Sequence, residues 1–236
     1  MKQAAICILD GMGPQAGGYL YNTIIQKAVR DYGAKNNDDF PEIILYSVPV
    51  PDFISNNRSK DRTLKMLQAK VRETNKLEIS CISIACNTAH ILLEQLQKET
   101  DIPFVSIIEE TIKGVKKDKV SVVGLMGTPS TLRFGFYQEE LKKEGIKCIV
   151  PSKAQIIILE RVTRNIIAGK VLQSDQSKLI SIADSFKKKG ARAIILGCTE
   201  LPLGFPKKYS LPIYNSVEEL CKALLRIYYG SNTIQK

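Results

Sequence analysis

The sequence lacks several features that mark particular protein classes. Its 236 residues include no tryptophan and a single histidine, and no two cysteines are spaced as CxxC. One histidine without such a pair argues against a zinc site. No apolar run approaches the roughly 18–20 residues of a membrane span. Residues 1–10 turn acidic after a very short apolar stretch and are interpreted as a first strand instead of a signal peptide. We therefore expect a cytoplasmic protein without a membrane partner.

Acidic residues are in the minority, which gives a net charge of +10. Such an excess raises the question of nucleic-acid binding. The lysines are scattered among helix-like segments with acids between them, and no nucleic-acid module signature is present. We therefore expect no nucleic-acid partner and interpret the basic residues as a solvated surface. The same surface can attract small acidic metabolites.

Six cysteines occur in a chain that shows no secretion signal, so we expect thiols instead of disulfides. Four of them lie in apolar strand-like runs or on a helix-like face and are interpreted as buried packing residues: Cys7, Cys81, Cys148 and Cys221. Cys86 and Cys198 differ, because each ends an apolar run and is followed by polar, turn-like residues. These two thiols are the candidates for chemistry.

Strand-like and helix-like segments alternate along the chain, which predicts parallel α/β architecture. The pattern also repeats. Cys86 and Cys198 lie 112 positions apart, and Met12 and Met126, each followed by glycine, lie 114 apart. We therefore predict duplication of one α/β unit. The expected fold is two pseudosymmetric Rossmann-like domains with mostly parallel sheets and a cleft between them.

The expected domains are 1–111 plus 212–236, and 112–211. A strand at 212–215 and a helix at 217–229 are predicted to return to the first domain. Single helices are expected at 18–35, 88–99 and 130–143.

Four motifs carry a resemblance to a known family. They are Gly11-Met12-Gly13-Pro14, Cys86-Asn87-Thr88-Ala89-His90, Leu125-Met126-Gly127-Thr128 and Gly197-Cys198-Thr199-Glu200. Their order and spacing resemble the aspartate/glutamate racemase family, and its aspartate racemase branch most of all. The resemblance covers essentially the whole chain. It implies interconversion of L- and D-aspartate or glutamate without pyridoxal phosphate or metal, and subunits that often pair as homodimers.

The chemistry of inversion suits two thiols. Inverting an α-carbon removes a proton from one face and returns one to the other, which a thiolate base and a thiol acid on opposite sides accomplish. Cysteine serves both roles, because its pKa near 8.5 is tuned by neighbouring dipoles and charges. By resemblance, Cys86 and Cys198 are the catalytic pair.

The supporting residues are argued from their position beside the two thiols. Glu200 follows Cys198 by two positions and is expected to relay its proton, with a first-turn acid favoured by the helix dipole as the alternative. His90 lies four residues after Cys86 and is expected either to pack there or to orient the thiol, instead of transferring protons. Thr128 is equally a substrate ligand or a helix cap. The expected substrate-binding residues are Asn87, Thr88, Thr128, Thr199, Met12, Gly13 and Phe53.

Two positions depart from the resembled pattern. Asp10 stands where aspartate racemases usually have glycine, and it either assists a thiol or bonds the Gly11–Gly13 turn. Phe53 occupies the place of an arginine expected to hold the substrate's side-chain carboxylate. Another cation would then be needed, with Arg58, Arg161 and Arg164 as candidates. The alternatives are a racemase or related lyase for another α-substituted acid, with or without an acidic side chain, and a non-catalytic small-molecule-binding α/β protein.

Overall fold

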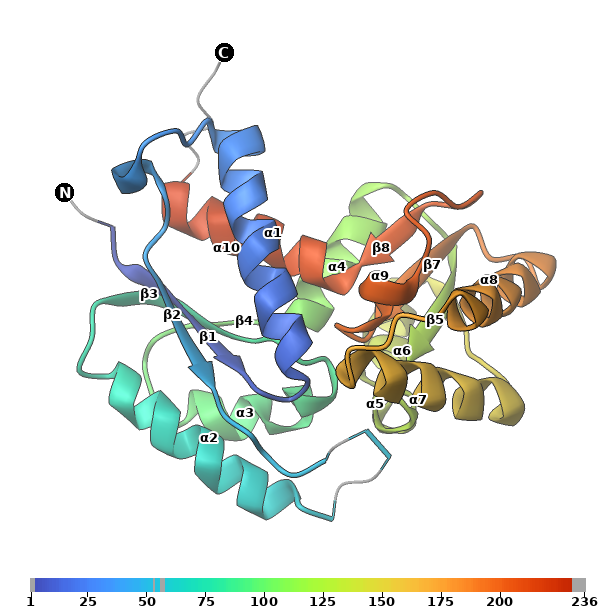
Figure 1. Ribbon diagram of the computed structural model, residues 1–236, viewed down its shortest axis with the longest axis horizontal. Coiled ribbons are helices and arrows are strands. Elements are labelled where there is room, and N and C mark those ends of the chain that lie inside the picture. The colour runs from blue at the N-terminus through green and yellow to red at the C-terminus, as the bar shows by residue number, and fades with distance from the viewer. Residues whose placement is uncertain (1–2, 53, 56–57, 231–236) are drawn as a thin grey trace. The chain divides into compact units, whose positions relative to one another are not determined.

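The computed structural model describes residues 3–52, 54–55 and 58–230, which form two compact units (Figure 1). The first unit contains the described residues of Met1–Pro51, Arg58–Ile107 and Val217–Lys236. Its elements are β1 (Ala5–Asp10), α1 (Pro14–Tyr32), the 3-10 helix η1 (Asn37–Asp39), β2 (Ile43–Ser47), α2 (Lys60–Thr74), β3 (Ile79–Ile84), the 3-10 helix η2 (Thr88–Leu92), α3 (Leu93–Gln97), β4 (Phe104–Val105) and α10 (Ser216–Tyr229).

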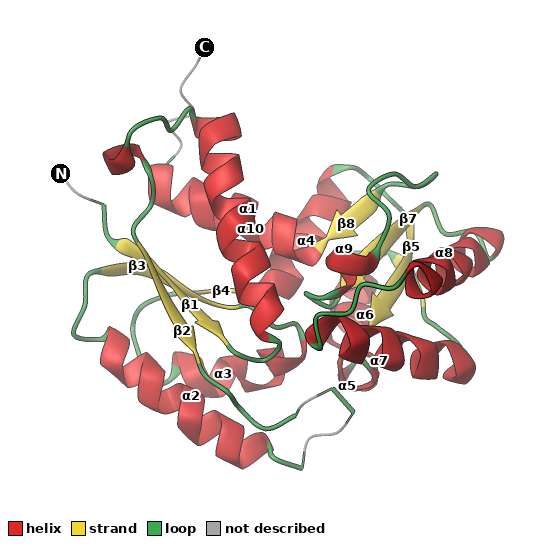
Figure 2. Ribbon diagram, viewed as in Figure 1, coloured by secondary structure: helices red, strands yellow, loops and turns green. Residues whose placement is uncertain are grey.

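The strands of the first unit form a parallel sheet in the order β2-β1-β3-β4. Helices α1 and α10 cover one face of this sheet, and α2 and α3 cover the other (Figure 2). Every residue of β1 is buried. A central parallel strand covered on both faces is typically a continuous apolar run, which explains why Ala5–Leu9 shows no alternation of polar side chains.

The second unit contains the described residues of Asp52–Asn57 and Ile108–Ser216. Its elements are α4 (Ile107–Lys117), β5 (Val122–Gly127), α5 (Pro129–Phe134), α6 (Phe136–Lys143), β6 (Lys147–Ile149), α7 (Lys153–Ile167), α8 (Gln173–Lys188), β7 (Ala193–Gly197), α9 (Leu201–Gly204) and β8 (Ile213–Asn215). Its strands are parallel in the order β6-β5-β7-β8.

The two sheets have the same topology. In each sheet, the second strand of the unit lies at one edge, and the first, third and fourth strands follow it in that order. The α/β fold class with parallel sheets is therefore confirmed, and the repeated topology supports the predicted duplication.

The core of the second unit lies between its sheet and the helices α7, α8 and α9. Alternate residues of β7 and its extension, Ile194, Leu196 and Cys198, point into one apolar cluster with Leu159 and Phe186 from the helices. Because successive strand residues face opposite sides of a sheet, the cysteine continues the same buried row. The chain therefore places the Cys198 thiol on the helix-covered face beside α7.

The expected return of the strand at 212–215 to the first domain is wrong. β8 pairs with β7 through Ile194↔Ile213 and Leu196↔Asn215, as the fourth strand of the second sheet. It occupies the place that β4 has in the first sheet, so the duplication includes it. The helix at 217–229 does join the first unit. The units thus divide near residues 107 and 216 instead of 111 and 211.

Three helix predictions also change. The first helix begins at Pro14, four residues earlier than expected, because proline suits the first helical turn. The expected helix at 130–143 is split at Gly135, whose φ of 78° ends α5. The expected helix at 88–99 is a 3-10 turn followed by the short α3. Helix α4 was not predicted at all. In the part of the chain that the structure describes, no helix has the length and apolar character to cross a bilayer.

Candidate functional site

The two candidate thiols occupy corresponding places in their own sheets. The last aligned pair is Leu9 of β1 with Ile84 of β3 in the first sheet, and Gly127 of β5 with Gly197 of β7 in the second. Cys86 comes two residues after its strand ends and Cys198 one residue after, so both lie just beyond the carboxyl end of the third strand of their unit. This edge is where open parallel α/β sheets place their ligands.

His90 is hydrogen-bonded to the backbone on both sides of its ring, including the carbonyl of Cys86. Its Nε2 lies 3.1 Å from the backbone N–H of Ile107, which donates to it, so this nitrogen carries no proton. The Nδ1–H therefore donates to the Cys86 carbonyl at 2.8 Å. Burial lowers the pKa of His90 to about 4. The imidazole is neutral and both of its nitrogens are engaged by backbone, which fits an orienting role and not proton transfer.

Asp10 ends β1 as a buried carboxyl, 2% exposed. Burial raises its pKa to about 6, although backbone hydrogen bonds from Gly11 and Gly17 act in the opposite direction. Its Oδ1 has no hydrogen-bond partner among the described residues. The side chain thus bonds the Gly11 turn, which is one of the two roles expected for it.

We expect Asp10 and His90 to give stability slopes of opposite sign with pH. Between pH 6.5 and 4 the unfolded chain protonates His90 and the native chain does not, so stability falls as pH decreases. Asp10 is the reverse case: the native chain holds its proton up to about pH 6, so stability falls as pH rises from 3.8. Each effect amounts to on the order of 3 kcal/mol over its window. The two largely cancel in the wild type.

Denaturant unfolding of two variants between pH 4 and 7 checks this expectation. Asp10→Asn removes the Asp10 contribution, so stability should rise with pH more steeply than in the wild type. His90→Gln removes the histidine contribution, so stability should shift toward falling with pH relative to the wild type. Curves that run parallel to the wild type in both variants would show that neither group titrates as described.

Glu200 lies directly against the second thiol. Its Oε2 accepts hydrogen bonds from Cys198 Sγ at 3.0 Å and from Thr199 Oγ1 at 3.0 Å. All three residues are buried. A carboxylate at this distance from a thiol can take up its proton and give it back. The geometry is therefore what the predicted proton relay requires.

The other predicted ligands lie at the same two strand edges. Thr128 caps α5, because its Oγ1 accepts from the backbone N–H of Thr131 at 3.1 Å, which is the alternative role considered for it. Asn87 and Thr88 are buried at the start of η2, immediately after Cys86. Met12 and Gly13 form the turn between β1 and α1. The structure thus brings Asp10, Met12 and Gly13 to the edge that holds Cys86, and Thr128 to the edge that holds Cys198.

The remaining four cysteines are packing thiols: Cys7, Cys81 and Cys221 are buried, as predicted, whereas Cys148 is half-buried. None of the six cysteines, all of which lie within the described residues, forms a disulfide. Burial raises the pKa of Cys7 to about 12, of Cys81 to about 11 and of Cys148 to about 12, and it raises the pKa of Cys221 further. Thiols of this kind stay protonated at neutral pH and do not act as bases.

Asp52 and Ser55, which belong to the second unit, are hydrogen-bonded to its helix α7. Arg164 Nη2 bonds Asp52 Oδ2 at 2.9 Å and Ser55 Oγ at 2.7 Å, and its Nε bonds Glu160 at 3.1 Å. The predicted position Phe53 lies outside the described residues. Of the three candidate cations, Arg58 and Arg161 are exposed, and Arg164 already pairs with two carboxylates. A substrate carboxylate would have to compete with them.

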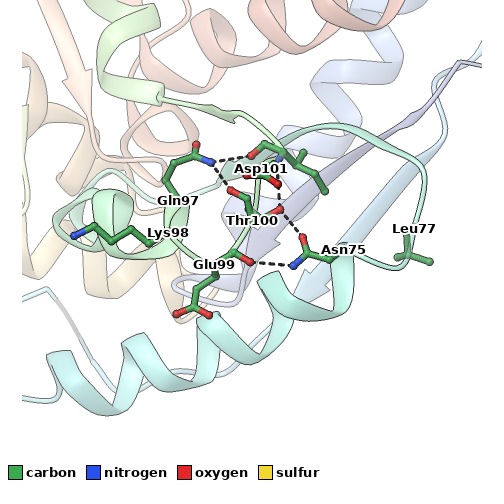
Figure 3. Close-up of a pocket in the computed structure, with 8 residues that line it drawn as sticks. Asn75, Leu77, Gln97, Lys98, Glu99, Thr100 and Asp101 are labelled. Atoms are coloured by element: carbon green, nitrogen blue, oxygen red, sulfur yellow. Dashed lines mark hydrogen bonds between the residues drawn. The ribbon is translucent and has the colours of Figure 1, made fainter.

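A hollow of about 660 Å³ lies at the opposite edge of the first sheet (Figure 3). Its lining residues precede β3 and β4, whereas Cys86 follows β3. The polar groups there bond one another: Thr100 Oγ1 donates to Asn75 Oδ1, and Gln97 Nε2 donates to the carbonyls of Thr100 and Ile102. This network closes the ends of α2 and α3 and is separate from the thiol edge.

One residue at the thiol was missed by sequence reasoning. Thr163 on α7 places its Oγ1 3.9 Å from Cys198 Sγ. The only signal was a hydroxyl on the buried face of an amphipathic helix, and that signal equally fits a packing residue.

Comparison with known proteins identifies the group to which these features belong. Residues 9–224 match the model of the Asp/Glu/Hydantoin racemase family. The chain is 28% identical over 224 residues to the broad-specificity amino-acid racemase RacX of Bacillus subtilis (strain 168), covering 94% of this chain and 97% of that protein.

Two solved structures are similar to the fold. An aspartate racemase homologue from Pyrococcus horikoshii OT3 superposes with a TM-score of 0.80 at 26% identity, covering 97% of this chain and all of that one. The Picrophilus torridus aspartate racemase gives a TM-score of 0.76 at 26% identity, covering 94% of this chain and 93% of that one. The resemblance drawn from the four motifs is confirmed, and the chain belongs to the Asp/Glu/Hydantoin racemase family.

Proposed function

We propose that this chain is an amino-acid racemase that uses Cys86 and Cys198 as its two proton carriers and needs neither pyridoxal phosphate nor metal. The observation that carries the proposal is the corresponding placement of the thiols, each one or two residues beyond the carboxyl end of the third strand of its own repeated sheet. Family membership supports the reaction class. Three further points stay predictions: that both thiols share one cleft, that the protein forms a homodimer, and that it is cytoplasmic.

The proposed mechanism is a proton transfer at each face of the α-carbon. One thiol, as its thiolate, removes the α-proton, and the other donates its own proton to the opposite face. At Cys198, the carboxylate of Glu200 at 3.0 Å takes the thiol proton before abstraction or returns it afterwards. At Cys86, Asp10 at the neighbouring strand end is the titratable group with a pKa near neutrality. The roles of the thiols exchange when the reaction runs in reverse.

We propose aspartate or glutamate as substrate, with weak selectivity for the acidic side chain. Phe53 provides no positive charge, and Arg164 is engaged by Asp52 and Glu160. The similarity to a relative named as a broad-specificity racemase supports the same reading. A charge-assisted hydrogen bond contributes roughly 1.5–3 kcal/mol, and 1.4 kcal/mol corresponds to a factor of about ten. An enzyme without that bond therefore discriminates less by about tenfold or more.

We expect the ratio of kcat/KM for aspartate to that for asparagine to be at least about tenfold smaller than in a racemase that holds the side-chain carboxylate with an arginine. The measurement is the initial rate of racemisation, by chiral chromatography, over aspartate, glutamate, asparagine and glutamine without added cofactor. Arg58→Gln, Arg161→Gln and Arg164→Gln, made singly, test for a substitute cation. If asparagine and glutamine were not racemised at all, and none of the three arginine substitutions changed the rate with aspartate, the proposal of a weakly selective pocket would be contradicted. Protection of the thiols by amino acids without any racemisation would instead identify a binding protein.

A further inference from the structure

Thr163 places a hydroxyl where the rest of α7 presents apolar side chains. Its neighbours Leu159, Val162 and Ile166 belong to the apolar cluster that also contains Cys198. Thr163 itself is 1% exposed. A buried hydroxyl without a partner destabilises a fold, so such groups are bonded. Within the described residues, the hydrogen-bond partner of this hydroxyl is Cys198 Sγ at 3.9 Å.

The direction of this hydrogen bond follows from the other side of the sulfur. The thiol has one proton, and Glu200 Oε2 accepts it at 3.0 Å. The sulfur then has only lone pairs left for Thr163, so the threonine hydroxyl is the donor. When the thiol gives up its proton, the hydroxyl still donates to the anion that remains.

A donor at this position matters because of the charges nearby. A carboxylate 3.0 Å from the sulfur disfavours a thiolate, since like charges repel. Tyr137 on α6 also interacts electrostatically with Cys198, and burial raises the pKa of its phenol, so it stays neutral. On α7, Glu160 and Arg164 are bonded to the loop at Asp52 and Ser55. Thr163 is therefore the group on α7 that can stabilise the Cys198 anion.

We propose that Thr163 is a further residue of the reaction centre, whose hydroxyl stabilises the Cys198 thiolate while Glu200 carries its proton. The two side chains have different roles at one sulfur. The Glu200 carboxylate accepts and returns the thiol proton, and the Thr163 hydroxyl stabilises the thiolate by donating a hydrogen bond to it. This inference rests on the proposed role of Cys198 and extends it to a residue of α7.

The test compares two substitutions of nearly equal shape. Thr163→Val removes the hydroxyl and keeps the branched side chain, whereas Thr163→Ser keeps the hydroxyl. The readout is the pKa of Cys198, followed by the ¹³Cβ shift of labelled cysteine from pH 5 to 11 and assigned with Cys198→Ser. We expect Thr163→Val to raise this pKa by about one unit, which is a tenfold loss of thiolate. Thr163→Ser should restore it, and the pKa of Cys86 should not move.

Racemisation measured in parallel separates this inference from the proposed function. With Thr163→Val, the rate should fall about tenfold below the thiol pKa and recover at high pH. A shifted Cys198 pKa in a protein that does not racemise would leave the inference standing and overturn the proposed function. An unchanged Cys198 pKa in an active Thr163→Val enzyme, or an equal shift at Cys86, would overturn the inference. Should Thr163→Val not fold, Thr163→Ala provides the same comparison.

Discussion

We expect Cys86→Ala and Cys198→Ala each to lose racemisation by roughly 10²–10⁴-fold, the range of a single acid–base group. Each substitution leaves one face of the α-carbon without its proton carrier. Both side chains are small and buried, so removing one sulfur should leave the protein folded. Initial rates in both directions, with circular dichroism as a check on folding, provide the measurement.

Cys81→Ala is the matched control. Cys81 lies on β3, five residues before Cys86, and is fully buried with a raised pKa. It should lose a little stability and keep its activity. If Cys86→Ala or Cys198→Ala kept more than about a tenth of the wild-type rate while Cys81→Ala behaved the same way, the assignment of the two thiols would be wrong.

We expect the neighbouring glycines of α1 to respond oppositely to alanine. A Cβ on Gly17 would collide with the Asp10 carboxylate, whereas a Cβ on Gly18 would meet nothing within 4 Å. Overpacking of this kind costs about 1–3 kcal/mol. Gly18→Ala should stabilise the helix by about 0.5–1 kcal/mol, because alanine loses less backbone entropy. In a chain of this size each kcal/mol moves Tm by about 2–4 °C.

Thermal and denaturant unfolding of the two variants checks this difference. Gly17→Ala should also disturb the pH dependence that Asp10 contributes, because the backbone N–H of Gly17 donates to that carboxyl. The Gly18→Ala curve should keep the wild-type pH dependence. Equal stabilities of the two variants would mean that α1 does not approach the end of β1 as closely as described.

The parts of this fold that were predictable from sequence depend on local patterns. The strands that end before Cys86 and Cys198 are short apolar runs followed by polar residues, and both are found within a residue or two. The repeated offsets predicted two α/β units, and the sheets have the same order. The spacing of four from Cys86 predicted that His90 packs beside or orients this thiol, and the hydrogen bond to the Cys86 carbonyl agrees with the second of these roles.

The parts that were missed depend on contacts between distant residues. β8 joins the second sheet because it pairs with β7. The sequence of its three residues does not indicate which of the two sheets it would join. Thr163 approaches Cys198 only because α7 packs on β5 and β7, 35 positions away in sequence. Asp52 and Ser55 follow the second strand of the chain, but their bonds to α7 span more than 100 residues. No periodicity within a window predicts such pairs.

Racemisation in heavy water is the measurement that bears most directly on the two-thiol account. Wild-type protein is given one enantiomer of aspartate without cofactor, and both enantiomers are separated early in the reaction and analysed for α-deuterium. In this mechanism one thiol removes the α-proton, and the other thiol, whose own hydrogen has exchanged with heavy water, supplies the hydrogen that replaces it. The account therefore predicts that the inverted product carries solvent deuterium while the remaining substrate stays largely protiated. Inverted product without deuterium would contradict the account.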